Sequence, residues 1–430
     1  MESGRHRLGL EGLTFTRLLS AFVFALAFTS AMCAAADEKA GRMDIKCVPG
    51  QAELGTVEIH GVGAGDFRPD LWEANKLNFV PDVRSPLIEP RKRGLFRNIY
   101  APSIVDLGDQ WRVFYGAWDG VDSGNDRIYS VNTRDFLDFG DRQTVIKHGD
   151  FIHCCNVNAI RLPSGEYRLM CTVYPDANDL NKPATFTSPD GVKWNGCPAP
   201  YPAKKSDIIT LEGYDKFKDA DINGMNVILY EDGVFRLYFN NFKDFGPVFR
   251  ATSKNGKDYK FDGVVLGAPG VVNDVKKLQA GGKTWYLMAL HMNTDKMWYS
   301  LSNDGRTFRE CRDLARNLGD KDRYMVAVGW VVRGNRVLGF LYGACPVPSV
   351  DRNRIYARWL QKKVIFVGDD GARYEAKSSL GPDRQIIEVP QDKQVNGHFE
   401  VYAEDGASLI ADDISGTLIP GAVYVISEPR

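Results

Sequence analysis

The stretch from Asp219 to Tyr259 decides the fold. It reads DADINGMNVILYEDG over 219–233, VFRLYFNNF over 234–242 and PVFRATSKNGKDYKF over 247–261. Short apolar runs alternate with turn residues, and Asn255-Gly256 is a dipeptide that favours a two-residue hairpin turn with positive φ. The pattern predicts three consecutive antiparallel strands, with a fourth beginning at Tyr259.

The same strand pattern recurs along the chain and forms five units. Each unit ends on an aromatic residue that follows its last hairpin: Phe139, Trp194, Tyr259, Phe308 and Phe366. A unit of four short strands repeated every ~40–50 residues is typical of a propeller blade, and the somewhat longer interval here leaves room for long loops. One such unit cannot bury both of its faces, so the units must stack. The sequence predicts an all-β, five-bladed β-propeller over residues 98–366; an open all-β sandwich is the alternative.

The N-terminus has the pattern of an export signal, predicted to span residues 1–36. Three arginines precede an almost wholly apolar run, 18–32, and small residues follow it up to Ala36, where we predict cleavage. Export to the periplasm or the medium follows from this pattern. Lipid anchoring at Cys33 is the less favoured alternative, because Met32 stands where a lipoprotein signal requires a small residue. The apolar run is too short for a membrane span, and no other segment predicts one.

The remaining segments and the net charge narrow the possible domain organisation and the possible partners. Residues 37–97 are expected to pack on the propeller or to complete its last blade, and residues 367–430 to form a small β appendage. The net charge of −1 and the absence of a basic stripe argue against a nucleic-acid partner. The chain has 8 cysteines, none with zinc-ligand spacing, and removal of Cys33 with the signal leaves an odd number and so at least one free thiol.

Propeller topology predicts where a functional site would form. The innermost strand of every blade begins at one end of the axis, and the loop between the second and third strands lies at that same end. Carboxylates and amides hydrogen-bond sugar hydroxyls and aromatic faces stack on sugar rings, so the residues at these positions predict a carbohydrate site. They are Asn98, Tyr100, His153, Asn156, Asn158, Asp219, Asp221, Asn223, Asn273, Asp274, Asp322 and Tyr324 at strand starts, and Trp118, Asp119, Asp122, Asp126, Tyr174, Asp176, Asn240, Asn241, His291, Asn293, Asp295, Asp351 and Arg352 in the loops.

Three motifs carry a resemblance to a known superfamily. They are YAPSIVDLGDQWRVFYGAWDG at 100–120, ADINGMNVILYEDGVFRLYFNN at 220–241 and the repeated S-x-(D/N)-G hairpins. Over about residues 98–366 the chain resembles the five-bladed propeller glycoside hydrolases, which include families 32, 43, 62, 117 and 130. The resemblance implies a secreted glycosidase with acidic residues at strand starts as acid and base. The chain departs from many relatives at Ala101-Pro102, where they have Asp-Pro.

Glycosidic cleavage needs one protonated and one ionised carboxyl group. We predict Asp221 as the acid and Asp274 as the base, with Asp119 as the third candidate; a turn residue is the alternative interpretation of each. The side chains predicted to bind the sugar are Tyr100, Trp118, Asn158, Asn223, His291 and Tyr324.

No cofactor is predicted beyond the calcium ion that some relatives hold on the propeller axis. Two alternatives to a glycosidase remain open at this point. One is a non-catalytic carbohydrate-binding propeller, which the missing Asp at Ala101-Pro102 favours. The other is a protein-interaction propeller, which would expose an apolar patch in place of an acidic pocket.

Overall fold

The computed structural model describes residues 54–59, 62–90, 96–118, 126–175, 180–267, 270–348, 352–389, 395–405, 409–418 and 423–427. The predicted signal peptide and Cys33 therefore lie outside the described residues. Within these ranges the chain is almost entirely strand and turn, with one short α-helix, α2 (Pro69–Glu73). The 3-10 helices are η2 (Lys205–Asp207), η3 (Phe217–Asp219) and η4 (Asp320–Asp322). No helix in this part of the chain has the length and apolar character needed to cross a membrane.

Five antiparallel sheets, each built from consecutive hairpins, form the larger part of the structure. Their strands, from the innermost outward, are β3 (Asn98–Asp106), β4 (Trp111–Trp118), β5 (Arg127–Thr133) and β6 (Gln143–Lys147); β7 (Cys154–Arg161), β8 (Tyr167–Val173) and β9 (Lys182–Ser188); β14 (Val227–Glu231), β15 (Val234–Phe239), β16 (Pro247–Ser253) and β17 (Asp258–Gly267); β18 (Val271–Ala280), β19 (Lys283–His291), β20 (Lys296–Ser302) and β21 (Arg312–Arg316); and β22 (Tyr324–Arg333), β23 (Arg336–Cys345) and β24 (Arg354–Leu360).

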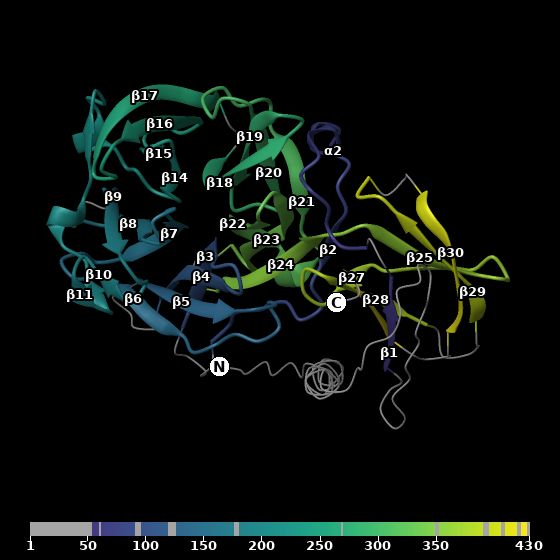
Figure 1. Cartoon of the computed structure of the whole chain (residues 1–430). Helices are drawn as coiled ribbons and strands as arrows, with labels where there is room; N and C mark the ends of the chain where they lie inside the picture. The colour runs from purple at the N-terminus through teal and green to yellow at the C-terminus, as the bar shows by residue number, and fades with distance from the viewer. Residues whose placement is uncertain are drawn as a thin grey trace, which may run out of the picture. The chain divides into compact units, whose positions relative to one another are not determined.

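The five sheets form a closed ring. Each innermost strand contacts the next in the cyclic order β3, β7, β14, β18, β22 and back to β3, and Figure 1 shows these strands converging at the centre. A separate hydrophobic cluster fills the space between each pair of neighbouring sheets, including the pair that joins the last sheet to the first. The fold is therefore a β-propeller, as the sequence predicted.

The residues between the second and third sheets contribute edge strands to their neighbours. The strands β12 (Tyr201–Pro202) and β13 (Thr210–Glu212) add in parallel to β6 and β17, respectively. Between β9 and β12, a short hairpin pairs β10 (Lys193–Trp194) with β11 (Cys197–Pro198). The outer edges of the first and third sheets are thus covered rather than left open for pairing with another chain.

The N-terminal segment completes the last sheet. Its strand β2 (Phe79–Pro81) pairs antiparallel with β24, with Val80 opposite Trp359. The repeat pattern assigned Val364–Phe366 to this outermost position, but these residues lie in β25 (Lys363–Gly368), which pairs with a C-terminal strand in a different sheet. The apolar run at 364–366 has the right composition for a blade strand, and only its long-range partner shows where it belongs.

Two further sheets form the C-terminal part. Their core consists of apolar residues from both sheets, among them Val57, Phe366 and Phe399. One sheet contains β26 (Arg373–Glu375), β25, β29 (Val395–Tyr402) and β30 (Leu409–Leu418); the other contains β1 (Leu54–Glu58), β31 (Val423–Ser427), β28 (Arg384–Glu388) and β27 (Ser378–Ser379).

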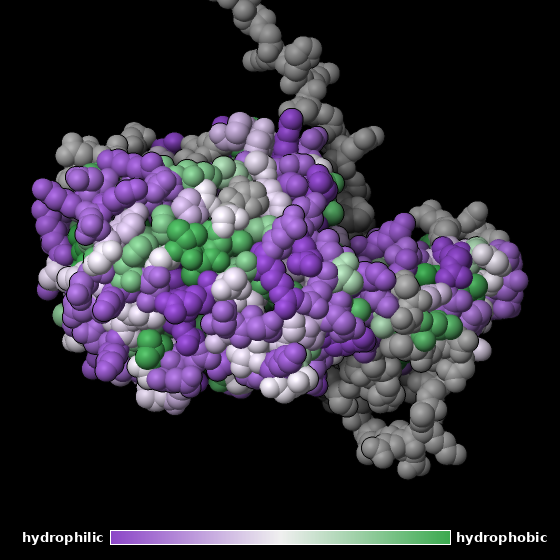
Figure 2. Space-filling view, turned by 90° about the horizontal axis from the view of Figure 1, so that it is seen from above, coloured by the Kyte–Doolittle hydropathy of each residue, from purple (hydrophilic) through white to green (hydrophobic). Residues whose placement is uncertain are grey.

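The face shown in Figure 2 is mainly hydrophilic, with hydrophobic residues exposed between the polar ones.

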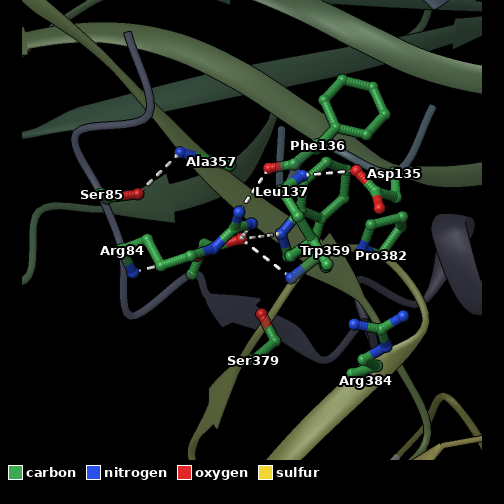
Figure 3. Close-up of polar contacts among 12 residues, drawn as sticks. Arg84, Ser85, Asp135, Phe136, Leu137, Ala357, Trp359, Ser379, Pro382 and Arg384 are labelled. Carbon is green, nitrogen blue, oxygen red and sulfur yellow. Dashed lines mark hydrogen bonds and ion pairs between the residues drawn. The ribbon is translucent and has the colours of Figure 1, made fainter. Parts of the chain in front are cut away.

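A buried carboxylate, Asp82, joins the segments that meet where the ring closes. It is 3% exposed and accepts hydrogen bonds from Trp359 Nε1 at 2.8 Å and from the Gly381 amide at 3.0 Å. The Arg84 guanidinium pairs with the same carboxylate at 2.6 Å and donates a hydrogen bond to the Phe136 carbonyl. Figure 3 shows the Arg84 side chain extending toward Phe136 and Trp359. Asp82 and Arg84 thus hold the N-terminal segment, the first sheet, the last sheet and the segment that leads to β28 together.

Candidate functional site

A pocket lies where the innermost strands begin, and all five sheets contribute to it. Its volume is about 460 Å³, which is within the range of ~300–1,000 Å³ typical of small-ligand sites. The residues that line it are Asn98, Tyr100, Trp118, Asp126, His153, Cys155, Asn156, Tyr174, Asn223, Gly224, Met225, Phe242, Phe245, Val271, His291, Met292, Asn293, Val326, Ala327 and Asn353. They come from the strand starts and the loops after second strands, which are the positions that propeller topology selects.

A shared backbone distortion shapes the strand starts. Ala101, Asn156 and Ala327 have φ values of 53°, 54° and 46°, and each lies at a register shift between the first and second strands of its sheet. A β-bulge of this kind bends the strand and redirects the neighbouring side chains. The residues just before the bulges, among them Tyr100 and Cys155, consequently line the pocket.

Asp126 is the only carboxylate among the pocket-lining residues that the structure describes. Asp126 is 9% exposed, and its Oδ2 accepts a hydrogen bond from the Tyr100 hydroxyl at 3.2 Å. The same oxygen lies 3.4 Å from Nδ1 of His153. Its other oxygen, Oδ1, is buried and has no hydrogen-bond partner within the described ranges. A buried carboxylate with an unused acceptor is costly unless a ligand or water completes it.

The groups around Asp126 are held in defined protonation states. Burial raises the pKa of the Tyr100 hydroxyl well above its usual value, and the charge of Asp126 raises it further. Burial also raises the pKa of the neighbouring Cys155 thiol, to which the Asp126 charge adds. Tyr100 therefore remains a neutral donor to the carboxylate, and Cys155 remains a thiol rather than a nucleophilic thiolate.

His291 lies on the other side of the pocket and is buried. Its Nδ1 lies 2.7 Å from Nδ2 and 3.0 Å from Oδ1 of the Asn273 amide. Burial lowers the pKa of His291 to about 4, and a hydrogen bond with Asn293 opposes this shift. The imidazole is therefore neutral at neutral pH and serves as a hydrogen-bonding group rather than as a cation.

The lowered pKa of His291 predicts a pH dependence of stability. An unfolded histidine titrates near ~6.5, so between pH 6.5 and about 4 the unfolded chain binds a proton that the folded protein does not. The contribution of His291 to the free energy of unfolding is thus full above pH 6.5 and falls as the pH is lowered toward 4. Urea unfolding at pH 7 and pH 4.5 should show a smaller loss in His291→Gln than in the wild type.

The control for this measurement is His398→Gln, because His398 lies 37% exposed in the C-terminal sheets. This variant should retain the wild-type difference between the two pH values. An equal pH response in the wild type and His291→Gln would show that the buried imidazole is not the group responsible.

Asp221, the predicted acid, does not line the pocket. Its Oδ1 accepts hydrogen bonds from the backbone and side-chain amides of Asn181. Its own amide donates to Asn241 Oδ1 at 3.2 Å, and its carbonyl accepts the Phe242 amide at 2.7 Å. Asp221 therefore fixes the loop that follows β15, and that loop carries part of the pocket wall.

Asp274, the predicted base, is 1% exposed and lies inside the ring. Its carboxylate pairs with Lys276 at 3.1 Å, accepts the Trp330 amide at 2.9 Å and lies 3.5 Å from Asn158 Nδ2. These contacts join the fourth, fifth and second sheets. They occupy both carboxylate oxygens, and Asp274 is not among the residues that line the pocket.

Asp274→Asn is expected to lower the free energy of unfolding by about 1–3 kcal/mol, the cost of weakening buried charged hydrogen bonds. Ligand binding in the pocket should change little. Guanidinium unfolding tests the first part and calorimetric titration the second. Asp295→Asn is the matched control, since the Asp295–Arg316 pair is exposed on both sides and should contribute less than ~1 kcal/mol. An Asp274→Asn variant as stable as this control would contradict the structural role.

Of the other predicted site residues, some line the pocket and some do not. Tyr100, Trp118, Asn223 and His291 line the pocket, whereas Asn158 and Tyr324 do not. Asn158 is buried and accepts the Ile228 amide at 3.0 Å. Asp119 lies outside the described residues, as do Asp122, Asp176 and Asp351.

Several lining residues were not singled out from the sequence. Asp126 and His153 stood in the wider set of residues predicted at this end of the axis, but nothing in the sequence ranked them above the other members of that set. Phe242 and Phe245 were missed because they resemble ordinary apolar loop residues. One feature of the sequence could have identified them. Asn240 and Asn241 stand between these two phenylalanines and the preceding strand, which places both in a loop after a second strand.

The described residues contain no group of three or more His, Cys, Asp or Glu side chains able to hold a metal ion.

Comparison with solved structures addresses the fold. No protein-family model matches the sequence, and no curated protein matches it. A structure from glycoside hydrolase family 130, described as a family of mannoside phosphorylases that contains hydrolases of β-1,2-mannosidic linkages in Candida mannan, is 14% identical with a TM-score of 0.50. The match covers 66% of this chain and 94% of that chain.

Two arabinofuranosidases of family 62 are also similar. The catalytic domain from Coprinopsis cinerea is 12% identical with a TM-score of 0.48, over 66% of this chain and 97% of that chain. The enzyme from Podospora anserina, in complex with cellotriose, is 11% identical with a TM-score of 0.48, over 66% and 96%. The likeness to the family 130 structure confirms the propeller fold that the sequence motifs indicated.

Proposed function

We propose that the protein is an exported glycoside hydrolase that binds a sugar in the pocket at the strand starts. The observation that carries this proposal is the buried carboxylate of Asp126, which lines the pocket with one oxygen held by Tyr100 and near His153 and the other unused among the described residues. The Asp126 side chain is 13% exposed, which leaves room for a sugar hydroxyl to donate a hydrogen bond to the carboxylate. The N-terminal sequence resembles an export signal, which supports export to a compartment in which polysaccharides occur.

In this mechanism, His153 takes the place of one of the two usual carboxyl groups. Cleavage requires a proton for the leaving oxygen and stabilisation of an oxocarbenium-like transition state. We assign the proton donation to His153, which lines the pocket and whose Nδ1 lies 3.4 Å from Asp126 Oδ2. Water adds to the anomeric carbon as the bond to the leaving oxygen breaks, and the proton that this water loses returns to the imidazole of His153. Asp126 stabilises the positive charge, first on the imidazolium and then on the sugar ring.

A non-catalytic carbohydrate-binding propeller is the second candidate. It is favoured by the positions of Asp221 and Asp274, which are both engaged in structural contacts away from the pocket. Within the described lining, Asp126 has no second carboxylate beside it.

The test uses protein comprising residues 37–430 and a panel of oligosaccharides and polysaccharides. Release of reducing ends reports hydrolysis, and calorimetric titration reports binding. Hydrolysis of any member that depends on Asp126 supports the enzyme. Binding without hydrolysis supports the second candidate, and the absence of both overturns both.

A further inference from the structure

The pocket has two chemically different sides. One side, here called the apolar wall, consists of Met225, Phe242, Phe245, Val271 and Met292. Phe242, Phe245 and Met292 are 37%, 42% and 38% exposed. The described residues contain eight exposed large hydrophobic side chains, so three of the eight gather in this one pocket. Exposed apolar side chains clustered in a concavity indicate a contact surface for an apolar ligand group.

Hydrogen bonds and a ring contact fix the loop that carries two residues of the apolar wall, Phe242 and Phe245. The Phe242 amide donates to the Asp221 carbonyl at 2.7 Å, and the Asn241 side chain bonds the Asp221 amide at 3.2 Å and the Tyr214 hydroxyl at 3.0 Å. The rings of Phe242 and Phe245 meet edge to face with centroids 5.6 Å apart. These contacts hold the two phenyl rings in place before a ligand arrives, which lowers the entropic cost of binding.

The polar groups beside the apolar wall are already engaged. The Asn223 side-chain oxygen accepts hydrogen bonds from Asn156 Nδ2 at 3.2 Å and from the next backbone amide at 2.7 Å. His291 is bonded to Asn273. Two oxygens of lining residues are buried without a partner among the residues the structure describes, Asp126 Oδ1 and Asn353 Oδ1. Asp126 and Asn353 belong to loops of the first and fifth sheets, whereas the apolar wall comes from the third and fourth sheets.

We infer that the ligand is a glycoside with an apolar, planar aglycone, whose sugar lies at Asp126 and whose aglycone lies on the apolar wall. This inference rests on the proposed sugar site and names the class of substrate it takes. A volume of about 460 Å³ accepts a sugar with one ring attached and excludes a folded partner. A second sugar in place of the aglycone could stack its C–H face on a phenyl ring, but its hydroxyl groups would find no hydrogen-bond partner on the apolar wall, which is unfavourable.

The experiment measures binding to protein of residues 37–430 by calorimetric titration. The probes are matched methyl and phenyl glycosides of glucose, galactose, mannose, xylose and arabinose, with a disaccharide of each sugar. For a sugar that binds, the phenyl glycoside is expected to bind at least about tenfold more tightly than the methyl glycoside, from burial of one phenyl ring. Phe242→Ala and Phe245→Ala should each reduce this ratio and leave the affinity for the methyl glycoside unchanged. Asp126→Asn should weaken both glycosides alike.

Leu318→Ala is the matched control, because Leu318 is exposed and lies outside the pocket lining; it should retain the full ratio. Equal affinities for methyl and phenyl glycosides overturn this inference and leave the proposed function standing. A disaccharide that binds as tightly as the phenyl glycoside, and weakens equally in Phe242→Ala, assigns the apolar wall to a second sugar and also overturns it. If neither kind of glycoside binds, the proposed function fails and this inference fails with it.

Discussion

Asp126→Asn is expected to lower kcat by about 10²–10⁴-fold on a confirmed substrate, the usual contribution of a group that assists proton transfer. The amide has nearly the same size as the carboxylate and still accepts a hydrogen bond from Tyr100, so the fold should be retained. It carries no negative charge to stabilise the His153 imidazolium or the oxocarbenium-like transition state. Steady-state kinetics and a thermal unfolding curve together test this expectation.

Asp221→Asn is the matched control, because Asp221 is an acidic residue at the same end of the axis that does not line the pocket. Its kcat should stay within a few-fold of wild type. Loss of activity in Asp221→Asn together with full activity in Asp126→Asn would restore the carboxylate assignment made from the sequence. His153→Gln should lose less on nitrophenyl glycosides than on natural ones, because a good leaving group needs little protonation.

Asp82→Ala is expected to lower the free energy of unfolding by about 3–5 kcal/mol. The substitution leaves the Arg84 guanidinium, whose side chain is 10% exposed, without its ion-pair partner. It also removes the acceptor for Trp359 Nε1 and for the Gly381 amide. Guanidinium unfolding followed by tryptophan fluorescence measures the loss.

Asp70→Ala provides the comparison on the same N-terminal segment. The Asp70–Arg68 pair has a similar geometry, 2.6 Å, but its side chains are 62% and 54% exposed. Exposed pairs contribute about 0–1 kcal/mol, so this variant should unfold close to the wild-type midpoint. Similar decreases in the free energy of unfolding in Asp82→Ala and Asp70→Ala would mean that Asp82 does not stabilise the place where the ring closes.

The repeated hairpins made the fold predictable, because their chemistry is local. In the hairpins at Gly191, Gly256 and Gly305, the glycine amide donates to the hydroxyl of the serine three residues earlier, at 2.7, 2.9 and 3.0 Å. All three glycines have positive φ, between 63° and 75°. A short motif that fixes its own turn can be recognised without knowledge of what lies around it.

The site was predictable only to the level of topology. The rule that strand starts and certain loops converge selected the end of the propeller at which the pocket lies. It did not separate Asp274 from Asp126, because the difference depends on register. The ladder shifts between Val272 and Asp274, and the Asp274 carboxylate meets Lys276 and Trp330 inside the ring. Such shifts and the resulting burial arise from packing between sheets, which a single sequence does not display.

The pairing of β2 with β24 also has a consequence for how the chain reaches its native state. The two strands are separated by nearly the whole propeller sequence, with Phe79 opposite Leu360. Contacts of such long sequence separation form late and slow the folding rate. During synthesis the segment around β2 emerges early and has no partner until β24 has followed it, so a nascent chain carries an unpaired apolar strand for most of its elongation. The last sheet therefore gains its outermost strand only after nearly the whole propeller sequence has been synthesised.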